Sequence, residues 1–273
     1  MKRRTFLKRL FNSIVGLGGL FALDAFWFEK YIIHWTEFDL SNGHEEKIKL
    51  VQLSDLHLRD LHSGLTSIAE KVNELKPDAI LFTGDTITRK TRLDLLDEYL
   101  NHFDDSVLKI FIYGNKEHSG RVPMDGFRQV IAKHNGMLLI NEGFGIRKRD
   151  RTLQFLGIDD FIGGNADFVH AISSIDDKNI DTIVLNHCPE YSDTIAKLNA
   201  SFKINLKCIL SGHTHGGQIT FFGKELYKPG GSGRYLKGWY KTGDIPMYVS
   251  KGIGTTILPI RFWARAEASV FLV

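Results

Sequence analysis

Five apolar runs, each of which stops at a polar side chain, constrain the fold of this chain more than any other feature. The runs are KIKLVQLS, AILFTG, LKIFIYG, TIVLN and LKCILSG. They lead, in that order, to Asp55 and His57, Asp85, Asn115, His187, and His213 and His215. Helical patterns lie between the runs at 65–76, 92–103, 125–134, 167–175 and 190–200. Strands that alternate with helices of this length predict an α/β layered domain.

The remaining β-type segments predict that the sheet is mixed. Residues 137–160 are expected to form meandering strands with turns at 141–145 and 149–150. Further strands are expected within 216–222, 247–254 and 268–273.

The polar residues after the five runs predict one site. In open α/β sheets, ligands lie beyond the carboxyl ends of the strands, and these ends share an edge. The converging side chains offer imidazole, carboxylate and amide groups, with no cysteine and no reactive serine. That mixture suits manganese, iron or zinc. Seven ligands exceed the three or so that one catalytic zinc takes. Two metals that share a carboxylate fit better, and such a pair favours phosphoester hydrolysis.

The motifs Asp-x-His, Gly-Asp, Gly-Asn, Asn-His and Gly-His-x-His, in this order, resemble the calcineurin-like metallophosphoesterase family from about residue 47 to the end. The resemblance implies a layered αββα fold and a metal-bridging hydroxide as nucleophile. It also implies that Asp55, His57 and His215 bind one metal. Asn115, His187 and His213 would bind the other, with Asp85 as the bridge. The tail YVSKGIGTTILPIRF resembles the membrane-associated, twin-arginine-exported branch of phosphodiesterases.

One position departs from the family pattern. A histidine usually follows the asparagine, whereas here Lys116 follows it and the next histidine is His118. We expect His118 to substitute in part as the catalytic residue. The alternatives are that Lys116 supplies positive charge without acid chemistry at neutral pH, or that the metals act alone. Arg59 and Arg234 are candidates for substrate binding, although each is equally compatible with an exposed loop arginine.

The first 30 residues indicate an export signal or an uncleaved membrane anchor, ahead of a phosphoesterase domain expected at 45–273. A basic patch, MKRRTFLKRL, precedes a mostly apolar stretch. The order Arg-Arg-x-Phe-Leu-Lys resembles a twin-arginine signal, and the stretch is long enough to span a bilayer. Either interpretation leaves the body outside the cytoplasmic membrane. A peripheral amphipathic segment with a cytoplasmic body is the alternative.

Charge and cysteine content exclude other classes of function. The net charge is +3, and the first nine residues carry five basic side chains, so nucleic-acid binding by the body is not expected. Two cysteines, Cys188 and Cys208, cannot form a disulfide framework.

The expected function is therefore a two-metal hydrolase of phosphodiester, pyrophosphate or monoester bonds, whose substrate is lipid- or envelope-linked. One alternative is a hydrolase of UDP-2,3-diacylglucosamine. That substrate is cytoplasmic, which conflicts with export of the body. The other is a metal-binding scaffold without turnover.

Overall fold

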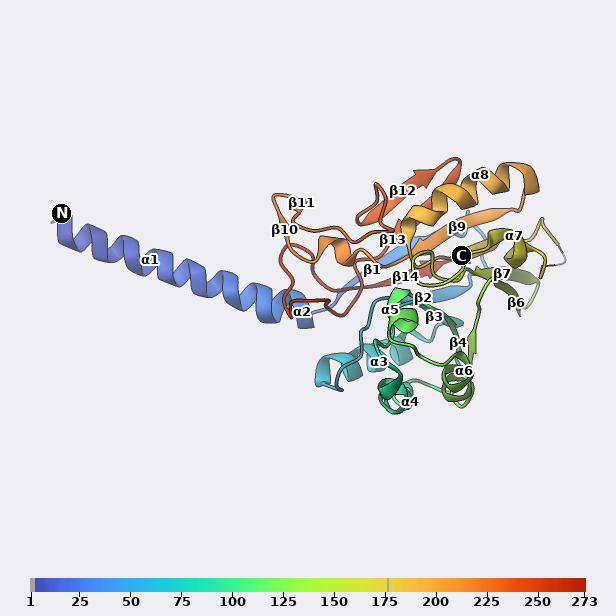
Figure 1. The fold of residues 1–273 in the computed structure, drawn as a ribbon, viewed down its shortest axis with the longest axis horizontal. Helices are drawn as coiled ribbons and strands as arrows, with labels where there is room; N and C mark the ends of the chain where they lie inside the picture. The colour runs from blue at the N-terminus through green and yellow to red at the C-terminus, as the bar shows by residue number, and fades with distance from the viewer. Residues whose placement is uncertain (1–2, 176) are drawn as a thin grey trace.

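Two mixed six-stranded sheets lie face to face between two layers of helices in the computed structural model, which describes residues 3–175 and 177–273 (Figure 1). The first sheet has the order β1 (His34–Asp39), β14 (Glu267–Leu272), β2 (Lys49–Leu53), β3 (Ala79–Thr83), β4 (Leu108–Ile112) and β5 (Gly136–Leu138). The second has the order β12 (Gly238–Thr242), β13 (Ile245–Val249), β9 (Leu206–Ser211), β8 (Thr182–Leu185), β7 (Arg151–Gly157) and β6 (Glu142–Lys148). The expected αββα architecture with mixed sheets is confirmed.

Side-chain alternation along the strands builds the layers. In β3, Ile80 and Phe82 pack toward the helices, while Ala79 and Leu81 pack against the second sheet. Strands covered on both faces are mostly apolar, which explains why the five runs do not alternate between apolar and polar residues. The helices that cover the first sheet are α3 (Ser63–Leu75), α4 (Leu93–Leu100) and α6 (Met124–Ala132), and those over the second are α7 (Phe168–Ile172) and α8 (Ser192–Phe202).

The five predicted strands and five predicted helices are all present, with shifted ends. The turn expected at 141–145 is wrong, because Gly143 and Gly145 lie inside β6 and pair with β7. The turn at 149–150 is confirmed. The sequence reading missed β1, which pairs with β14 and lies ahead of the domain start expected at 45.

The polar strand ends belong to two sheets, so the expectation of a single sheet edge is wrong. β2, β3 and β4 run parallel in the first sheet, and β8 and β9 run parallel in the second. Because the sheets pack face to face, the carboxyl ends of both sets meet at one end of the sandwich.

The N-terminal helix projects away from this sandwich (Figure 1). It comprises α1 (Arg3–Leu23), a π-helical turn at Asp24–Phe28 and α2 (Glu29–Tyr31). By length and composition it could cross a membrane, and it is almost wholly exposed.

Candidate metal centre

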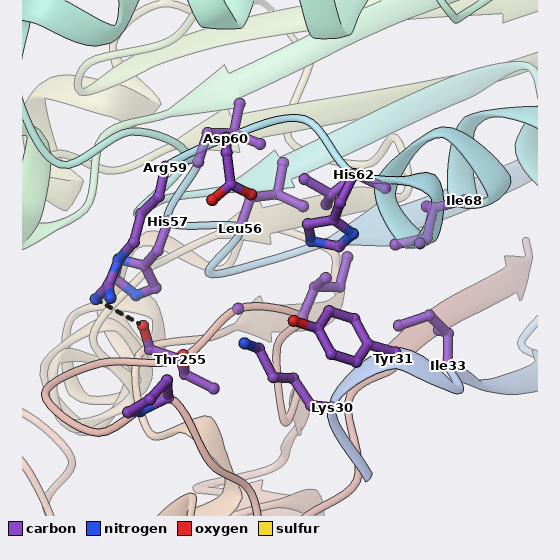
Figure 2. Close-up of a pocket in the computed structure, with 16 residues that line it drawn as sticks. Lys30, Tyr31, Ile33, Leu56, His57, Arg59, Asp60, His62, Ile68 and Thr255 are labelled. Atoms are coloured by element: carbon purple, nitrogen blue, oxygen red, sulfur yellow. Dashed lines mark hydrogen bonds between the residues drawn. The ribbon is translucent and has the colours of Figure 1, made fainter. Parts of the chain in front are cut away.

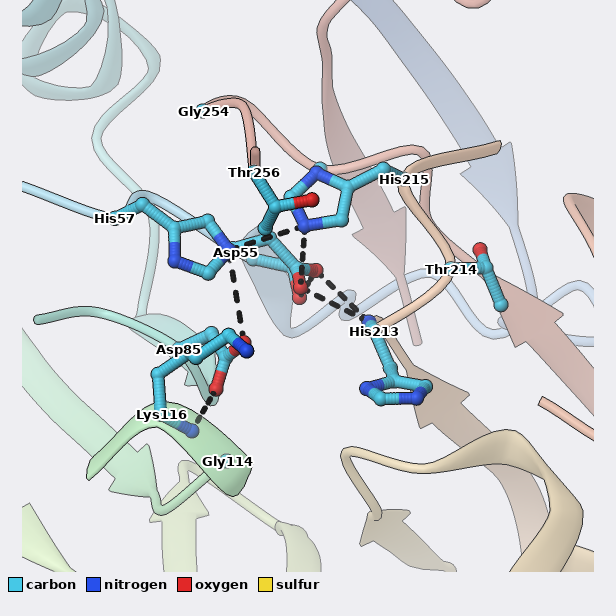
Figure 3. A network of polar contacts seen from close by, with 12 residues as sticks. Asp55, His57, Asp85, Gly114, Lys116, His213, Thr214, His215, Gly254 and Thr256 are labelled. Atoms are coloured by element: carbon cyan, nitrogen blue, oxygen red, sulfur yellow. Dashed lines mark hydrogen bonds and ion pairs between the residues drawn. The ribbon is translucent and has the colours of Figure 1, made fainter. Parts of the chain in front are cut away.

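Five of the seven predicted ligands occupy strained backbone turns directly after their strands. Their φ angles are positive, a region that non-glycine residues enter rarely and at a cost of about 1–2 kcal/mol each. The five are Asp55 (54°), His57 (46°), Asp85 (52°), His213 (73°) and His215 (51°). Such strain persists where the surrounding fold imposes it, commonly at functional sites. Here it turns the side chains into one buried space (Figure 3).

Asp55, His57 and His215 form the first half of the site. The Nε2 atoms of His57 and His215 lie 3.0 Å apart, and His215 Nε2 lies 3.5 Å from Asp55 Oδ1. All three residues are buried. In a neutral imidazole, each ring nitrogen carries either a hydrogen or a lone pair, so each of these two Nε2 atoms presents one or the other to its neighbour. A cation coordinated by both nitrogens would satisfy both lone pairs at once.

Asn115, His187 and His213 form the second half, in which backbone carbonyls orient both imidazole rings. His187 Nδ1 donates to the carbonyl of Thr83 at 2.8 Å, and His213 Nε2 donates to that of Gly230 at 2.6 Å. A carbonyl only accepts, so the bonded nitrogen carries a hydrogen and the other nitrogen of each ring faces the site. The facing nitrogens are His187 Nε2, which has no hydrogen-bond partner among the described residues, and His213 Nδ1, which lies 3.1 Å from Asn115 Oδ1.

Asp85 lies between the two halves. Its Oδ2 is 3.5 Å from His57 Nε2, and its Oδ1 is 3.4 Å from His187 Nε2. The backbone N–H of Lys116 donates to Oδ1 at 2.8 Å. One carboxylate therefore faces a histidine of each half, as a bridging ligand would.

Electrostatics within the cluster keep most of its imidazoles neutral and Asp85 ionised. Burial lowers the pKa of His57 to about 4 and holds those of His213 and His215 below the usual histidine range. Burial raises the pKa of Asp85, but the charges of His187 and His57 and the hydrogen bonds from His187 and the Lys116 backbone together lower that pKa well below its usual range. His187 shows the reciprocal effect. Burial lowers the pKa of His187, but the charge of Asp85 and its hydrogen bond, together with the charge of Asp55, raise that pKa overall.

The donor set fits two divalent cations. It combines buried carboxylates, an amide oxygen and inward-facing imidazole nitrogens, and of these nitrogens His187 Nε2 accepts or donates no hydrogen bond within residues 3–175 and 177–273. Two groups, Asp55 with His57 and His215 and Asp55 with Asp85 and His187, bring their ligand atoms within 4.8 Å of one another. Glycines keep this space open. A Cβ at Gly84, whose φ is +91°, would overlap the ring of His187, and one at Gly114 would overlap Asp85.

Two buried ionisable residues, Glu117 and Arg261, support the site but were not predicted from the sequence. Glu117 accepts backbone N–H groups from Asp85, Ile87 and Gly114 at 2.9–3.0 Å, so it ties together the turns after β3 and β4. The guanidinium of Arg261 lies 3.3 Å from His215 Nδ1 and donates to several backbone carbonyls. Glu117 lies two residues after Asn115 of the Gly-Asn motif, which was its only local signal. Arg261 sits in an apolar tail with no signal.

The four residues expected around the ligands fall in different places. Lys116 lines a pocket with Asp85, Asn115, His213 and His215. His118 does not line that pocket, and its Nε2 instead contacts Asp159 Oδ1 at 2.7 Å. Arg234 is also directed elsewhere, toward Asp193 at 3.5 Å.

Arg59 lies close to the ligands. It lines the pocket shown in Figure 2 together with His57, and it donates to the carbonyl of Thr255 at 3.3 Å.

A basic cavity adjoins the first half. It has a volume of about 540 Å³ and is lined by His57, Thr88, Thr256, Ile257 and four cationic side chains, Arg59, Arg89, Arg92 and Lys116. Within residues 3–175 and 177–273, no carboxylate forms an ion pair with any of the four. This uncompensated charge makes the cavity suited to an anion.

Comparisons with known proteins agree with this geometry. The model of the calcineurin-like phosphoesterase family matches residues 48–217. The metallophosphoesterase YkuE of Bacillus subtilis is 32% identical over 99% of this chain and 97% of its own length. YkoQ from the same organism is 26% identical over 82% of this chain and 83% of its own.

A protein of Danio rerio described as a transmembrane protein with a metallophosphoesterase domain is 28% identical, over 82% of this chain and 52% of its own length. The family model covers more than half of the chain, and the match to YkuE extends along nearly all of it. The chain therefore belongs to the calcineurin-like phosphoesterase family and is a metal-dependent phosphoester hydrolase.

Proposed function

We propose that the protein hydrolyses phosphodiester, pyrophosphate or phosphomonoester bonds with two divalent cations, drawn from manganese, iron and zinc. The position of Asp85 between two buried ligand sets carries this proposal. Asp55, His57 and His215 would hold one cation. Asn115, His187 and His213 would hold the other. When bound, such a pair of cations would polarise phosphoryl oxygens and lower the pKa of a coordinated water to near neutrality.

The protein's own contribution is to hold the ligands and to orient the substrate. The strained turns and the carbonyls of Thr83 and Gly230 hold the imidazoles in place before binding, which lowers the cost of assembling the site. Burial excludes bulk water and strengthens each electrostatic interaction.

The basic cavity supports an anionic substrate. Arg59, expected from the sequence to bind substrate, lines it beside His57, and Lys116 lines both it and the ligand pocket. We propose that Lys116 provides fixed positive charge next to the scissile phosphate, in place of the family's histidine. His118, bonded to Asp159, would then act by holding the helix α5 (Asn115–Ser119), which begins at the ligand Asn115.

We also propose that residues 1–30 anchor the protein in the cytoplasmic membrane and that the body, 45–273 together with β1, lies outside it. The support is the exposed apolar helix behind a basic N-terminus. Replacing Arg3 and Arg4 by lysine tests export through a twin-arginine route. We expect the body to become inaccessible to protease added to intact spheroplasts, whereas unchanged accessibility would contradict this route.

Turnover of model substrates tests the hydrolase. Purified protein is supplied with Mn²⁺, Fe²⁺ or Zn²⁺ and with bis-p-nitrophenyl phosphate or p-nitrophenyl phosphate. We expect release of p-nitrophenolate that Asp85→Asn abolishes. Metal binding at two ions per chain without turnover of either substrate would instead favour the scaffold.

A further inference from the structure

A group of exposed apolar side chains lies beside the ligand pocket, and two of its members, Tyr227 and Ile257, line that pocket. The members of the group lie on the hairpin of β10 (Thr220–Phe221) and β11 (Lys224–Glu225), on the residues after it, and on the loop before Pro259. We call this group the apolar rim, and its members are Phe221, Phe222, Leu226, Tyr227, Ile257 and Leu258. Phe222 and Ile257 are each 81% exposed, and Leu226 is 72% exposed. A contiguous group of this kind marks an interaction surface.

The rim is continuous with the N-terminal helix through stacked aromatic rings. Phe21 of α1 contacts Phe262 at 5.9 Å between ring centroids, and Phe262 stacks on Trp263 at 5.2 Å. Trp263 in turn contacts Phe221 and Phe222 at 5.6 and 5.3 Å. Figure 1 shows the hairpin beside the body-proximal end of the helix.

These contacts fix the depth of the rim relative to a membrane. The apolar stretch of the helix begins after Arg9, and about 20 helical residues cross the hydrocarbon core. A span that starts at Leu10 therefore ends close to Glu29. Phe21 then lies about 12 Å inside the boundary, at 1.5 Å per residue. Phe262, whose ring centroid is 5.9 Å from that of Phe21, then lies inside the same boundary, and the rim beyond it lies close to the membrane surface.

The rim and the proposed ligands share one pocket. Tyr227 and Ile257 line the same pocket as Asn115, His213 and His215. Ile257 is a β-branched residue at a φ of +56°, which is a strained conformation. Because the side chain of Ile257 is so exposed, its packing against the described residues contributes little stability to offset this strain.

We infer that the apolar rim rests on the bilayer and that the ligand pocket opens at the headgroup level, where it takes phosphoesters of membrane lipids. This inference rests on the proposed hydrolase function and on the membrane anchor. Aromatic side chains beside the end of a membrane span favour the interface, so lipid is a better occupant than a protein partner. In the reaction, water adds to phosphorus, the ester P–O bond breaks, and the alcohol leaves with a proton from water.

Depth-dependent quenching tests the docking. The full chain carries Phe222→Cys with an environment-sensitive label, in vesicles of phosphatidylethanolamine and phosphatidylglycerol with doxyl-labelled phosphatidylcholine. Native Cys188 and Cys208 are buried, so they label poorly. The control is Asp150→Cys, in the exposed β6–β7 turn at the amino-terminal end of β7 and thus at the opposite end of the sandwich. We expect quenching at 222 and none at 150.

An unquenched label at 222, in vesicles that retain the protein after carbonate extraction, would overturn the inference and assign the rim to a protein partner. Equal quenching at both positions would also overturn it, because the whole body would then lie against lipid without a defined face.

A pair of substrates that share a leaving group tests the consequence for catalysis. Hexadecyl p-nitrophenyl phosphate is presented in the vesicles, and bis-p-nitrophenyl phosphate in solution. Phe222→Asn suits the positive φ of 49°. We expect it to lower kcat/KM for the vesicle substrate about tenfold and to leave the soluble substrate unchanged.

The matched control is Val169→Asn, at an exposed apolar residue of α7 away from the rim. It should change neither rate. Equal losses on both substrates with Phe222→Asn would refute docking, because the substitution would then act on the site itself. If the parent protein turns over neither substrate, the proposed hydrolase function is refuted. The quenching experiment tests membrane docking independently of that result.

Discussion

The two halves of the candidate metal centre are held in place by different means. In the first half, Asp55, His57 and His215 all have positive φ angles, and His57 Nδ1 has no hydrogen-bond partner in the part of the chain that the structure describes. In the second half, the rings of His187 and His213 are oriented by backbone carbonyls. Of the second half, only His213 has a positive φ. Positive-φ turns thus position every residue of the first half, where Arg261 and Ser54 add side-chain hydrogen bonds to His215 and Asp55, whereas backbone carbonyls orient both rings of the second half.

This difference indicates that the second half is set before any cation binds, because backbone carbonyls already fix the orientation of both rings. The first half brings two imidazole nitrogens to 3.0 Å and gains more from a cation that fills the space between them. Asp85 lies 3.5 Å from a histidine of the first half and 3.4 Å from one of the second, so its charge acts on both halves.

Removing the shared carboxylate charge should have the largest effect. Asp85→Asn keeps the shape of the side chain but removes its negative charge from both halves. We expect kcat for bis-p-nitrophenyl phosphate to fall by more than about 100-fold and both cations to bind more weakly. Turnover and metal content per chain measure this. His102→Asn, at an exposed histidine whose ring makes no contact with the cluster, should leave both unchanged. Retention of two tightly bound ions in Asp85→Asn would mean that the halves are independent.

Substituting one histidine in each half separates their roles. We expect His57→Asn and His187→Asn each to lose one of two bound ions and to lower turnover by about 10- to 100-fold. The strained first half should also lose more of its metal-dependent rise in Tm, because a cation relieves its facing nitrogens. Elemental analysis and thermal unfolding with and without EDTA give both quantities. Identical rises in Tm for the two variants would remove the distinction between the halves.

Gly84→Ala tests the space behind the second half. The φ of +91° and the overlap of a new Cβ with His187 should together lower the free energy of unfolding by about 1–3 kcal/mol. Gly223→Ala is the matched control, since Gly223 has a φ of +80° with nothing near its Cβ position. It should cost less than Gly84→Ala, and the difference measures the overlap alone. Equal losses would show that His187 moves away freely.

The smallest effect is expected at His118, beside the second half. The hydrogen bond with Asp159 raises the pKa of His118 above the usual 6.5. The bond therefore stabilises the fold fully below that usual value, and the contribution is lost as pH rises through the higher folded-state pKa. His118→Gln should lower stability by less than about 1 kcal/mol near pH 5.5 and change little near pH 9.

Activity distinguishes positioning from catalysis at His118. As a positioning residue, it should leave the pH profile of turnover unchanged when substituted. A general acid would instead lose 100-fold or more in kcat together with one limb of that profile.

Residue types and their order along the chain were enough to predict the layered fold, the strand ends and the seven ligand candidates. Apolar runs of strand length and amphipathic helices are local patterns, because each reflects burial on a face that repeats every few residues. Asp55, Asp85 and His213 follow their strands directly, so the sequence alone predicts that they share an end of the fold.

Only the tertiary structure decided which side chains face the site. The ligands come from two sheets, the turn after Asn115 presents Lys116 and directs His118 to Asp159, and Arg234 pairs with Asp193. Arg261 reaches His215 from 46 positions along the chain. These outcomes depend on partners far apart in sequence, whose proximity and burial exist only after the sheets pack. Local patterns therefore identify the chemical groups, whereas long-range packing decides their direction.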